Sequence, residues 1–272
     1  MMPTVQIWGL GLMGLSLATG LLDHGFEVYG RDRAPEAERF AARQGVRIGR
    51  AAEPRWCVIA VPPEAVADVV EEVAPSLTEA TVLTDLTSVK GPVLPHLARL
   101  PGRLPVVSSH PMAGNEQGGR ENFRPTLYQD RLWALIPVEG HAVPWDAMRE
   151  LVEPLGARLT TLPARDHDRI AAFTSHLPYL SALALSSVLE RLPDSGRALL
   201  GPGFLSATRA AVAPSELWSQ ILLANHESVR EALAALQGEL AAWDQALEQA
   251  SRPALEERIE AIRARRQVLS AR

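Results

Sequence analysis

The chain lacks the features that mark several specialised classes of protein. Its single cysteine, Cys57, lies in an apolar run typical of a buried strand, which excludes a disulfide framework and predicts a reducing, cytoplasmic location. The net charge of -5 excludes a general attraction to nucleic acid or anionic lipid. Because no apolar run reaches about 18 residues and no basic segment opens the chain, neither a membrane span nor a signal peptide is predicted. No metal site is predicted either.

What the sequence does contain is enough apolar material for two modest cores. The chain has 272 residues, of which 47% are hydrophobic and 22% charged. Short apolar strands alternate with amphipathic helices in the first half, whereas the second half shows only helical spacing. We therefore expect an α/β Rossmann-type dinucleotide-binding domain over residues 1–163, with a parallel sheet covered on both faces. An all-α substrate and dimerisation domain should follow over residues 164–272.

A glycine-rich turn at the start of the chain predicts the cofactor. It follows the strand Val5–Trp8 and leads into a helix, and it consists of Gly9, Leu10, Gly11, Leu12, Met13 and Gly14. In such a motif the glycines make the turn, admit a pyrophosphate and let the helix pack on the strand. Asp32 follows the second strand, where a carboxylate can accept hydrogen bonds from ribose hydroxyls. We take these residues, together with Val61 and Ser88 at later strand ends, as cofactor-binding candidates.

The choice between NAD and NADP depends on three adjacent residues. Asp32 repels a 2′-phosphate, which favours NAD. Arg31 and Arg33 flank it and could turn toward that phosphate, so NADP stays possible; both could equally be solvated surface residues.

Three loops should converge on the cofactor edge of the sheet, because each follows the carboxyl end of a strand. They begin at Pro62, Leu86 and His110. His110 is followed by proline, and glycine comes soon after, so the segment can approach a ligand closely. By itself this histidine could be a catalytic base or simply a hydrogen-bonding loop residue. The neighbouring cofactor loops favour the base.

The helical half contains two further candidates. Pro178 should open the helix at His176, which then either faces a ligand or caps the freed carbonyl groups. Arg209 stands among small apolar residues, where it is either a surface side chain with a buried stem or the partner of a substrate carboxylate. After Pro214 one helix of about 30 residues is predicted, and its apolar stripe favours packing against a second copy of the chain. Asn225 lies within that stripe, where it could set register or reach the site.

Taken together, the motifs resemble those of the prephenate/arogenate dehydrogenase family of tyrosine biosynthesis. The resemblance runs from residue 5 to about 225 and rests on the glycine turn, Asp85–Lys90, His110–Glu116, His167-Asp168, Ser175–Pro178, Gly203-Phe204, Thr208-Arg209 and Trp218. It implies an oxidative decarboxylation in which hydride leaves the ring carbon that bears the hydroxyl group, carbon dioxide departs, and the ring becomes aromatic. Nothing after the long helix resembles a regulatory or mutase domain, so we expect a dehydrogenase alone.

The resemblance also implies roles for individual residues. His110 would accept a proton or hydrogen bond from the ring hydroxyl, Ser88 would orient that hydroxyl, and His176 would line the same pocket. Substrate would be bound by Arg209, through the ring carboxylate, with Glu116 and Trp218 nearby. Two positions depart from the family pattern: Tyr179 replaces a common second histidine, and Ser206 stands where an aspartate often follows Gly-Phe.

Two other interpretations stay open at this point. A β-hydroxyacid dehydrogenase shares the glycine-rich domain followed by helices, but it relies on a helical lysine, and the helical half here has no lysine. A non-catalytic dinucleotide-binding protein would need neither histidine for chemistry. The sequence does not separate prephenate from arogenate, since both share the ring and its carboxylate.

Overall fold

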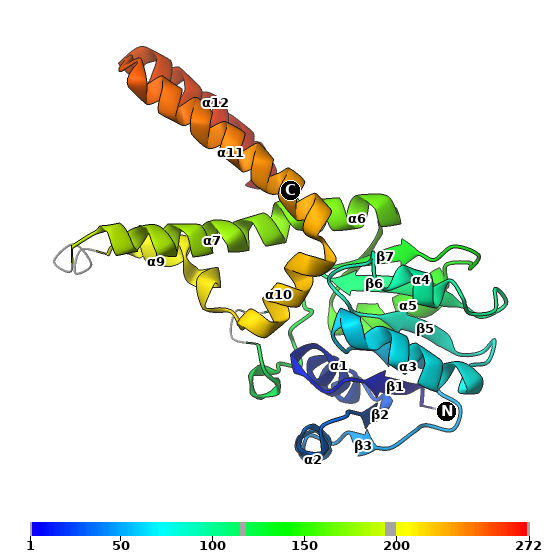
Figure 1. Ribbon diagram of the computed structural model, residues 1–272. Helices are drawn as coiled ribbons and strands as arrows, with labels where there is room; N and C mark the ends of the chain where they lie inside the picture. Colours follow the sequence, from blue (N-terminus) through cyan, green and yellow to red (C-terminus); the bar gives the residue numbers. More distant parts are fainter. Residues whose placement is uncertain (1, 115–117, 194–199, 271–272) are drawn as a thin grey trace. The chain divides into compact units, whose positions relative to one another are not determined.

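The computed structural model describes residues 2–114, 118–193 and 200–270, and its first part is an α/β sheet domain (Figure 1). Within the described residues the sheet has eight strands in the order β3-β2-β1-β4-β5-β6-β7-β8. Their bounds are β1 Thr4–Trp8, β2 Glu27–Arg31, β3 Arg47–Ile48, β4 Trp56–Ile59, β5 Val82–Asp85, β6 Val106–Pro111, β7 Leu132–Pro137 and β8 Arg158–Thr161. The strand order reverses between β1 and β4, which is where such sheets bind nucleotides.

The sheet is mixed rather than wholly parallel. Strands from β3 through β6 pair in parallel, but β7 runs antiparallel to β6, with His110 opposite Ala134, and β8 is parallel to β7. The expectation of a parallel sheet was therefore wrong at this edge. A run of apolar residues shows that a strand is buried but carries no information about its direction, which is set by the connection that leads into it.

Helices cover both faces of the sheet, as predicted, and each face has its own core. One core joins Val5, Ile7 and Val58 to α1 and α5; the other joins Cys57, Ile59 and Leu83 to α3 and α4. The helices of this part are α1 Leu12–Asp23, α2 Pro35–Arg43, α3 Val66–Val73, α4 Leu94–Leu97 and α5 Trp145–Val152, with short 3-10 turns at Pro63–Ala65, Ala74–Ser76, Arg120–Asn122 and Glu153–Leu155. Successive strand residues alternate between the two cores, which explains why the strands read as continuous apolar runs.

The helix after β5 is short. Of the segment from Gly91 to Leu100, only Leu94–Leu97 forms α4. Pro92 and Pro95 both lack the backbone N–H that a helix interior requires, so the segment cannot sustain the full hydrogen-bond ladder.

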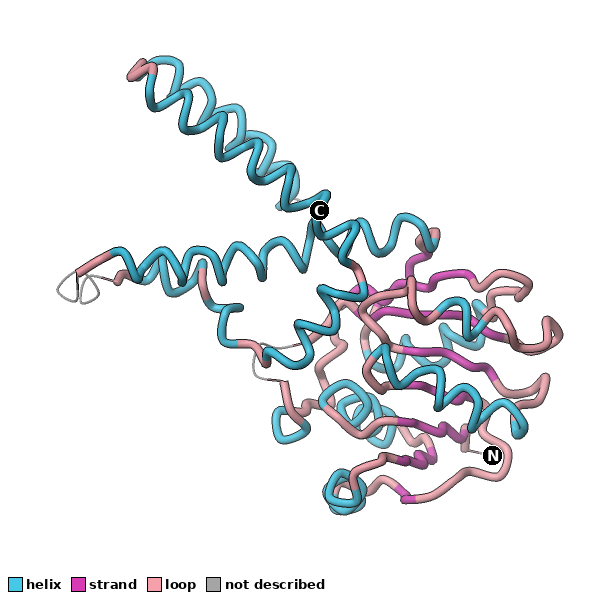
Figure 2. Tube along the Cα trace, in the orientation of Figure 1, coloured by secondary structure: helices cyan, strands magenta, loops and turns pink. Residues whose placement is uncertain are grey.

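From Ala164 the described chain contains helices and turns but no strand (Figure 2). Helix α6 spans Ala164–Ala171, a π-helical turn spans Ala172–His176, and α7 continues over Leu177–Val188. The local opening predicted at His176 is thus confirmed, and its cause is that Pro178 cannot donate to the helix ladder. The following elements are 3-10 turn Leu189–Arg191, α9 Pro202–Ala207, 3-10 turn η7 Arg209–Val212 and α10 Ser215–Ala224.

The long helix predicted after Pro214 is interrupted. Helix α10 ends before Asn225, whose backbone leaves the helical region at φ −120°, and α11 spans His226–Glu248. The apolar stripe continues across the break, so its periodicity gave no sign of it. The chain divides into two compact units, Met1–His226 and Glu227–Arg272. The second unit comprises most of α11 together with α12 Arg252–Ser270, joined by an ion pair between Arg258 and Glu239.

None of the helices in the described residues combines the length and the apolar character needed to cross a bilayer. The compact units divide after His226. The domain boundary expected at residue 163 stays a prediction.

Candidate active site

The glycine turn has the geometry that a pyrophosphate site requires. Gly9 has a φ of +96°, and a Cβ there would lie 2.5 Å from the carbonyl oxygen of Ala60. A Cβ on Gly14 would lie 1.9 Å from the carbonyl oxygen of Gly9, so the helix can meet the strand only at a glycine. At Gly11, by contrast, a Cβ would meet nothing within 4 Å. The first turn of α1 has no side-chain cap, which leaves its N–H groups directed at this open position.

Asp32 is held against the same turn. Its Oδ2 accepts a hydrogen bond from the backbone N–H of Leu10 at 2.7 Å, and its Oδ1 accepts one from Ala34 at 2.8 Å. The carboxylate is therefore fixed beside the turn, and each oxygen retains a lone pair for a ribose hydroxyl. These residues fit the ribose and pyrophosphate of a dinucleotide.

The arginines that flank Asp32 differ in what they contact. The Nε of Arg31 lies 3.0 Å from Glu38, which directs this guanidinium to a neighbouring carboxylate. Arg33 is exposed. The surface interpretation of Arg31 is thus favoured. Val61 follows β4 and is half-buried, and its side chain would be 2.9 Å from a Cβ at Gly9, so it forms one wall of the turn.

His110 is the next-to-last residue of β6, so it belongs to the strand itself rather than to the loop that follows. Pairing with β7 extends the strand to Pro111 and fixes the backbone at the histidine. His110 is half-buried at the carboxyl edge of the sheet, while Ser108 and Ser109 before it are buried. A histidine in this position has a fixed backbone and an accessible side chain.

A second histidine and an aspartate from α6 continue from His110 in a hydrogen-bonded chain. The Nδ1 of His110 lies 2.9 Å from the Nε2 of His167, and the Nδ1 of His167 lies 2.7 Å from the Oδ1 of Asp168. His167 is only 2% exposed. The chain occupies Nδ1 of His110 and leaves Nε2 as the ring nitrogen that can meet a ligand.

The carboxylate of Asp168 is also bound by the backbone after β5. Its Oδ1 accepts from the N–H of Lys90 and its Oδ2 from the N–H of Gly91, both at 2.8 Å. Burial alone would raise the pKa of Asp168, but the hydrogen bonds from His167 and from these two backbone groups outweigh it and lower the pKa. Asp168 is therefore an anion at neutral pH.

His176 joins the cluster from the π-helical turn through Asn225. The Nδ2 of Asn225 donates to the backbone oxygen of Asp168 at 2.7 Å and lies 3.2 Å from the Nδ1 of His176. Asn225 thus reaches the site, one of the two roles considered for it. Burial, with a smaller effect from His167, lowers the pKa of His176 to about 4, although Asp168 acts in the opposite direction. His176 is consequently neutral at physiological pH.

Aromatic side chains close one side of His176. Its ring meets Trp218 edge-on at 6.1 Å, and Trp218 stacks on Tyr179 with centroids 3.8 Å apart. Two sequence candidates, His176 and Trp218, are therefore neighbours. The departure at Tyr179 also has a role in packing, because the phenol ring supplies the stacking surface.

Beneath His110 lies a buried polar network centred on Lys90, the only lysine in the sequence. Its Nζ donates to Asp85 at 2.7 Å, to Thr87 at 3.1 Å and to the carbonyl oxygen of Ser109 at 2.6 Å. Asp85 also accepts from Ser108. Burial lowers the pKa of Lys90, and the Asp85 carboxylate opposes that shift by its charge and its hydrogen bond.

The electrostatics of the cluster keep His110 neutral. Burial is the largest cause, and the positive charge of Lys90 comes next, followed by His167 and His176; together they lower the pKa of His110 well below 6.5. A pH profile of activity governed by this residue should therefore rise well below the ordinary histidine range. The imidazole is an acceptor throughout the physiological range.

Three other sequence candidates remain: Ser88, Arg209 and Glu116. Ser88 is half-buried in the loop after β5, two residues before Lys90. Arg209 is exposed at the start of η7, an element that packs against α7. Glu116 lies outside the described residues. The roles assigned to these three stay predictions.

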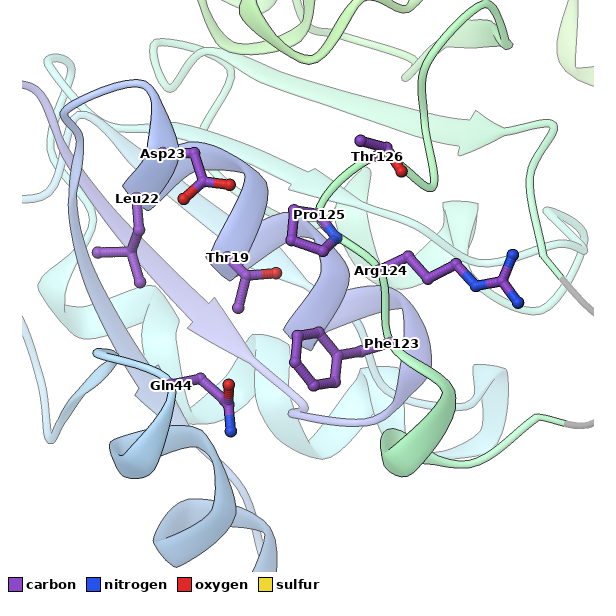
Figure 3. Close-up of a pocket in the computed structure, with 8 residues that line it drawn as sticks. All are labelled: Thr19, Leu22, Asp23, Gln44, Phe123, Arg124, Pro125 and Thr126. Carbon is purple, nitrogen blue, oxygen red and sulfur yellow. The ribbon is translucent and has the colours of Figure 1, made fainter.

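A hollow of about 470 Å³ lies at the other end of α1 from the glycine turn (Figure 3). Its lining comes from the last residues of α1, from Gln44 after α2, and from the segment Phe123–Thr126. It contains none of the histidines described above, so it is separate from the candidate site.

Sequence reasoning did not assign a function to His167, Asp168 or Lys90. A signal for the first two was available, because the pair lies in a helix in which His167 shares its buried face with Ala171, and a buried histidine needs a polar partner. Lys90 gave a weaker signal, as the only lysine of the sequence, in the loop after the buried strand β5.

Comparison with known proteins identifies the family. The family model for the prephenate dehydrogenase nucleotide-binding domain matches residues 17–161, and the model for the prephenate dehydrogenase dimerization domain matches residues 163–261. The chain belongs to the prephenate dehydrogenase family. The resemblance found in the sequence is thereby confirmed, as is the Rossmann-type domain followed by helices.

Individual relatives agree with this assignment. The prephenate dehydrogenase of Lactococcus lactis subsp. cremoris is 28% identical over 244 residues, which cover 85% of this chain and 67% of that one. A probable prephenate dehydrogenase of Streptomyces niveus, NovF, is 32% identical over 247 residues, covering 88% and 67%. A crystal structure of the Aquifex aeolicus prephenate dehydrogenase with hydroxyphenyl propionate and NAD+ has a TM-score of 0.87 at 25% identity and covers 99% of both chains.

Proposed function

We propose that this protein catalyses the NAD-dependent oxidative decarboxylation of prephenate or arogenate, giving 4-hydroxyphenylpyruvate or tyrosine. The observation that carries the proposal is the neutral imidazole of His110, held at the carboxyl edge of a dinucleotide-binding sheet with its Nδ1 engaged by His167. Family membership supports the same reaction.

The chemistry needs a hydrogen-bond acceptor at the ring hydroxyl. As hydride leaves the ring carbon that bears this hydroxyl, positive charge would build up on the oxygen unless its proton moves to a base. The Nε2 of His110 would take that proton. The bond to the ring carboxylate then breaks, its electron pair completes the aromatic ring, and the proton returns from His110 to the phenolic oxygen, so that no net proton is consumed. A positioned base of this kind contributes about 10²- to 10⁴-fold in rate.

Bound NAD+ would supply the hydride acceptor. The residues that would hold it are the glycine turn, the first turn of α1 and Asp32, which lie at the strand-order reversal. We propose NAD rather than NADP as the preferred cofactor, because Asp32 would repel a 2′-phosphate and Arg31 is directed to Glu38.

Roles for the other candidates follow from position. Ser88, in the loop that also carries Lys90, would orient the hydroxyl group, and His176 would line the pocket with Trp218 beside it. Arg209 would bind the ring carboxylate, for which its planar guanidinium is suited. Glu116 is kept as a substrate-binding candidate from the family resemblance alone.

The direct test measures turnover with each combination of substrate and cofactor. Purified protein is mixed with prephenate or arogenate and with NAD+ or NADP+, NADH or NADPH formation is followed by absorbance, and products are identified by chromatography. We expect reduced cofactor together with 4-hydroxyphenylpyruvate or tyrosine, and faster turnover with NAD+. Absence of reduced cofactor in all four combinations would remove the proposed activity.

We also propose a homodimer formed through the C-terminal helices. The matched second domain is described as a dimerization domain, and the second compact unit exposes large apolar side chains, among them Leu240, Leu247 and Ile259 at 57%, 62% and 47%. Such side chains on one short pair of helices indicate a partner surface. Sedimentation velocity should give the mass of two chains, and a monomer at micromolar concentration would contradict this. A cytoplasmic location stays a prediction.

A further inference from the structure

In the hydrogen-bonded chain from His110 to Asp168, the donor and the acceptor of each bond can be assigned. The assignment decides which ring nitrogen of His110 carries a proton. Asp168 is an anion whose two oxygens already accept from the backbone N–H groups of Lys90 and Gly91. A carboxylate can only accept, so the Nδ1 of His167 must carry a proton in order to donate to it.

The same argument assigns the hydrogen bond between His167 and His110. In its neutral form with the proton on Nδ1, His167 has a lone pair on Nε2, and this atom lies 2.9 Å from the Nδ1 of His110. That separation is a hydrogen bond only if the Nδ1 of His110 donates. Neutral His110 then has no proton on Nε2, so its lone pair is on the nitrogen left for the substrate hydroxyl.

We propose that His167 and Asp168 are positioning residues that hold His110 in the tautomer with a lone pair at Nε2. The catalytic consequence of this inference rests on the proposed function; the tautomer itself does not. In the opposite tautomer, Nε2 would carry a proton and would face the substrate hydroxyl as a donor, so His110 could not accept.

The anchoring of Asp168 supports the proposal. Its side chain is fastened by two backbone N–H groups from the loop after β5, and its backbone oxygen accepts from Asn225. The carboxylate thus connects a sheet loop to α6 and is fixed at both ends. The two imidazole rings meet edge to face, with centroids 5.1 Å apart and planes 64° apart, which suits an in-plane N–H donor.

The hydrogen bond to His167 favours the protonated form of His110 during the reaction, against the burial and the charge of Lys90 that lower its pKa. When His110 takes the hydroxyl proton, the imidazolium is hydrogen-bonded through His167 to an anion. No proton needs to move along the chain for this effect, because the lone pair of His167 and the charge of Asp168 are already oriented toward it.

A pair of substitutions at His167 separates orientation from proton transfer. His167→Gln keeps a carboxamide oxygen that can accept from His110 and an NH₂ group that can donate to Asp168, but it cannot relay a proton. His167→Leu has a similar volume and offers neither group. We expect His167→Gln to retain most of kcat and His167→Leu to lose about 10- to 100-fold, with KM little changed in both.

Asp168→Asn tests whether the carboxylate of Asp168 decides which atoms donate along the chain. An amide in this position must present its NH₂ group either to the N–H of Gly91 or to the N–H of Lys90 and the Nδ1 of His167, all of which are already donors, so at least one hydrogen bond is lost or reversed. We expect kcat to fall about 10- to 100-fold while the dissociation constant for NAD+ stays within about twofold. Asp166→Asn, a carboxylate on the same helix whose partner is the exposed Arg165, is the matched control and should leave both unchanged.

The decisive readout does not depend on turnover. Nitrogen-15 chemical shifts distinguish protonated from unprotonated ring nitrogens, and the signals of His110 are assigned by their loss in His110→Asn. We expect protonated Nδ1 and unprotonated Nε2 in the unaltered protein, and a mixture of tautomers in His167→Leu, which offers His110 no acceptor. A protonated Nε2 in the unaltered protein, or an unchanged spectrum in His167→Leu, would overturn the inference.

These measurements separate the two levels of argument. If the unaltered protein reduces no cofactor with either substrate but shows the expected tautomer, the proposed function fails and the positioning role of His167 and Asp168 stands. If turnover is normal and His167→Leu matches His167→Gln, the reaction stands and the positioning role fails.

Discussion

Two polar networks lie against the end of β6, and they differ in whether they are closed. Around Lys90 the ammonium group donates to Asp85, Thr87 and Ser109, and none of these contacts reaches solvent. Around His110 the chain runs through His167 to Asp168 and stops at a ring that is partly exposed. The first network satisfies itself, while the second has one end available to a ligand.

This difference separates stability from chemistry. A closed network of buried charges contributes to stability only while both partners are present, because either charge alone would be costly to bury. An open network holds a group in a defined protonation state for a ligand that arrives later. The two networks are linked, since the backbone N–H of Lys90 donates to Asp168 and the charge of Lys90 helps to lower the pKa of His110.

Substituting His110, the end of the second network that a ligand can reach, should have the largest effect on activity. His110→Asn removes the acceptor for the hydroxyl proton, and we expect kcat to fall by about 10²- to 10⁴-fold, while NAD+ binding stays within about twofold. Stopped-flow single-turnover assays would measure the chemical step, and fluorescence titration would measure NAD+ binding. Turnover close to that of the unaltered protein would show that another group is the base.

Breaking the closed network should instead lower stability. Lys90→Met leaves the Asp85 carboxylate buried without its cation, and we expect a loss of about 3 to 5 kcal/mol in the free energy of unfolding. Urea denaturation followed by circular dichroism would measure it. The control is Arg149→Met, which removes an exposed ion pair with Asp146 and should change the free energy by less than about 1 kcal/mol.

The pairing can be tested further by removing both charges. Asp85→Leu combined with Lys90→Met leaves no buried charge, so part of the lost stability should return. If Lys90→Met alone were as stable as Arg149→Met, the ammonium group would not be the partner on which Asp85 depends.

The comparison also shows what the sequence can and cannot predict. The glycine turn, Asp32 and the position of His110 at a strand end were predictable because each depends on neighbours within a few residues, or on the rule that parallel strands end at one edge. The direction of β7 was not predictable, because an apolar run fits either orientation. The break at Asn225 was missed for a similar reason, since the apolar spacing continues through it.

The polar contacts of the site could not be predicted from the sequence. His110 and His167 are 57 positions apart, as are Asp168 and Asn225, and their contact depends on how α6 and α10 pack. Periodicity can place a residue on a helix face, but it does not say which strand end that face will meet. The family resemblance named the His167-Asp168 pair without a role, and only the hydrogen-bond geometry supplied one.

The smallest predicted effect is the dependence of stability on pH that His176 causes. Burial lowers the pKa of His176 to about 4, whereas an unfolded histidine titrates near 6.5. Between these values the unfolded chain binds a proton that the folded chain does not. The contribution to stability is therefore fully present above pH 6.5 and is lost as the pH falls toward 4.

For His176 this amounts to about 2 kcal/mol between about pH 7 and about pH 5. His110 acts in the same direction, so the two must be separated by substitution. His176→Gln can still accept from Asn225 but does not titrate, and its free energy of unfolding should fall less steeply with acid than that of the unaltered protein. His226→Gln, at an exposed histidine, is the control. Equal slopes in the unaltered protein and in His176→Gln would mean that His176 is as free to take up a proton in the folded site as in the unfolded chain. In that case the aromatic enclosure by Trp218 would not desolvate it.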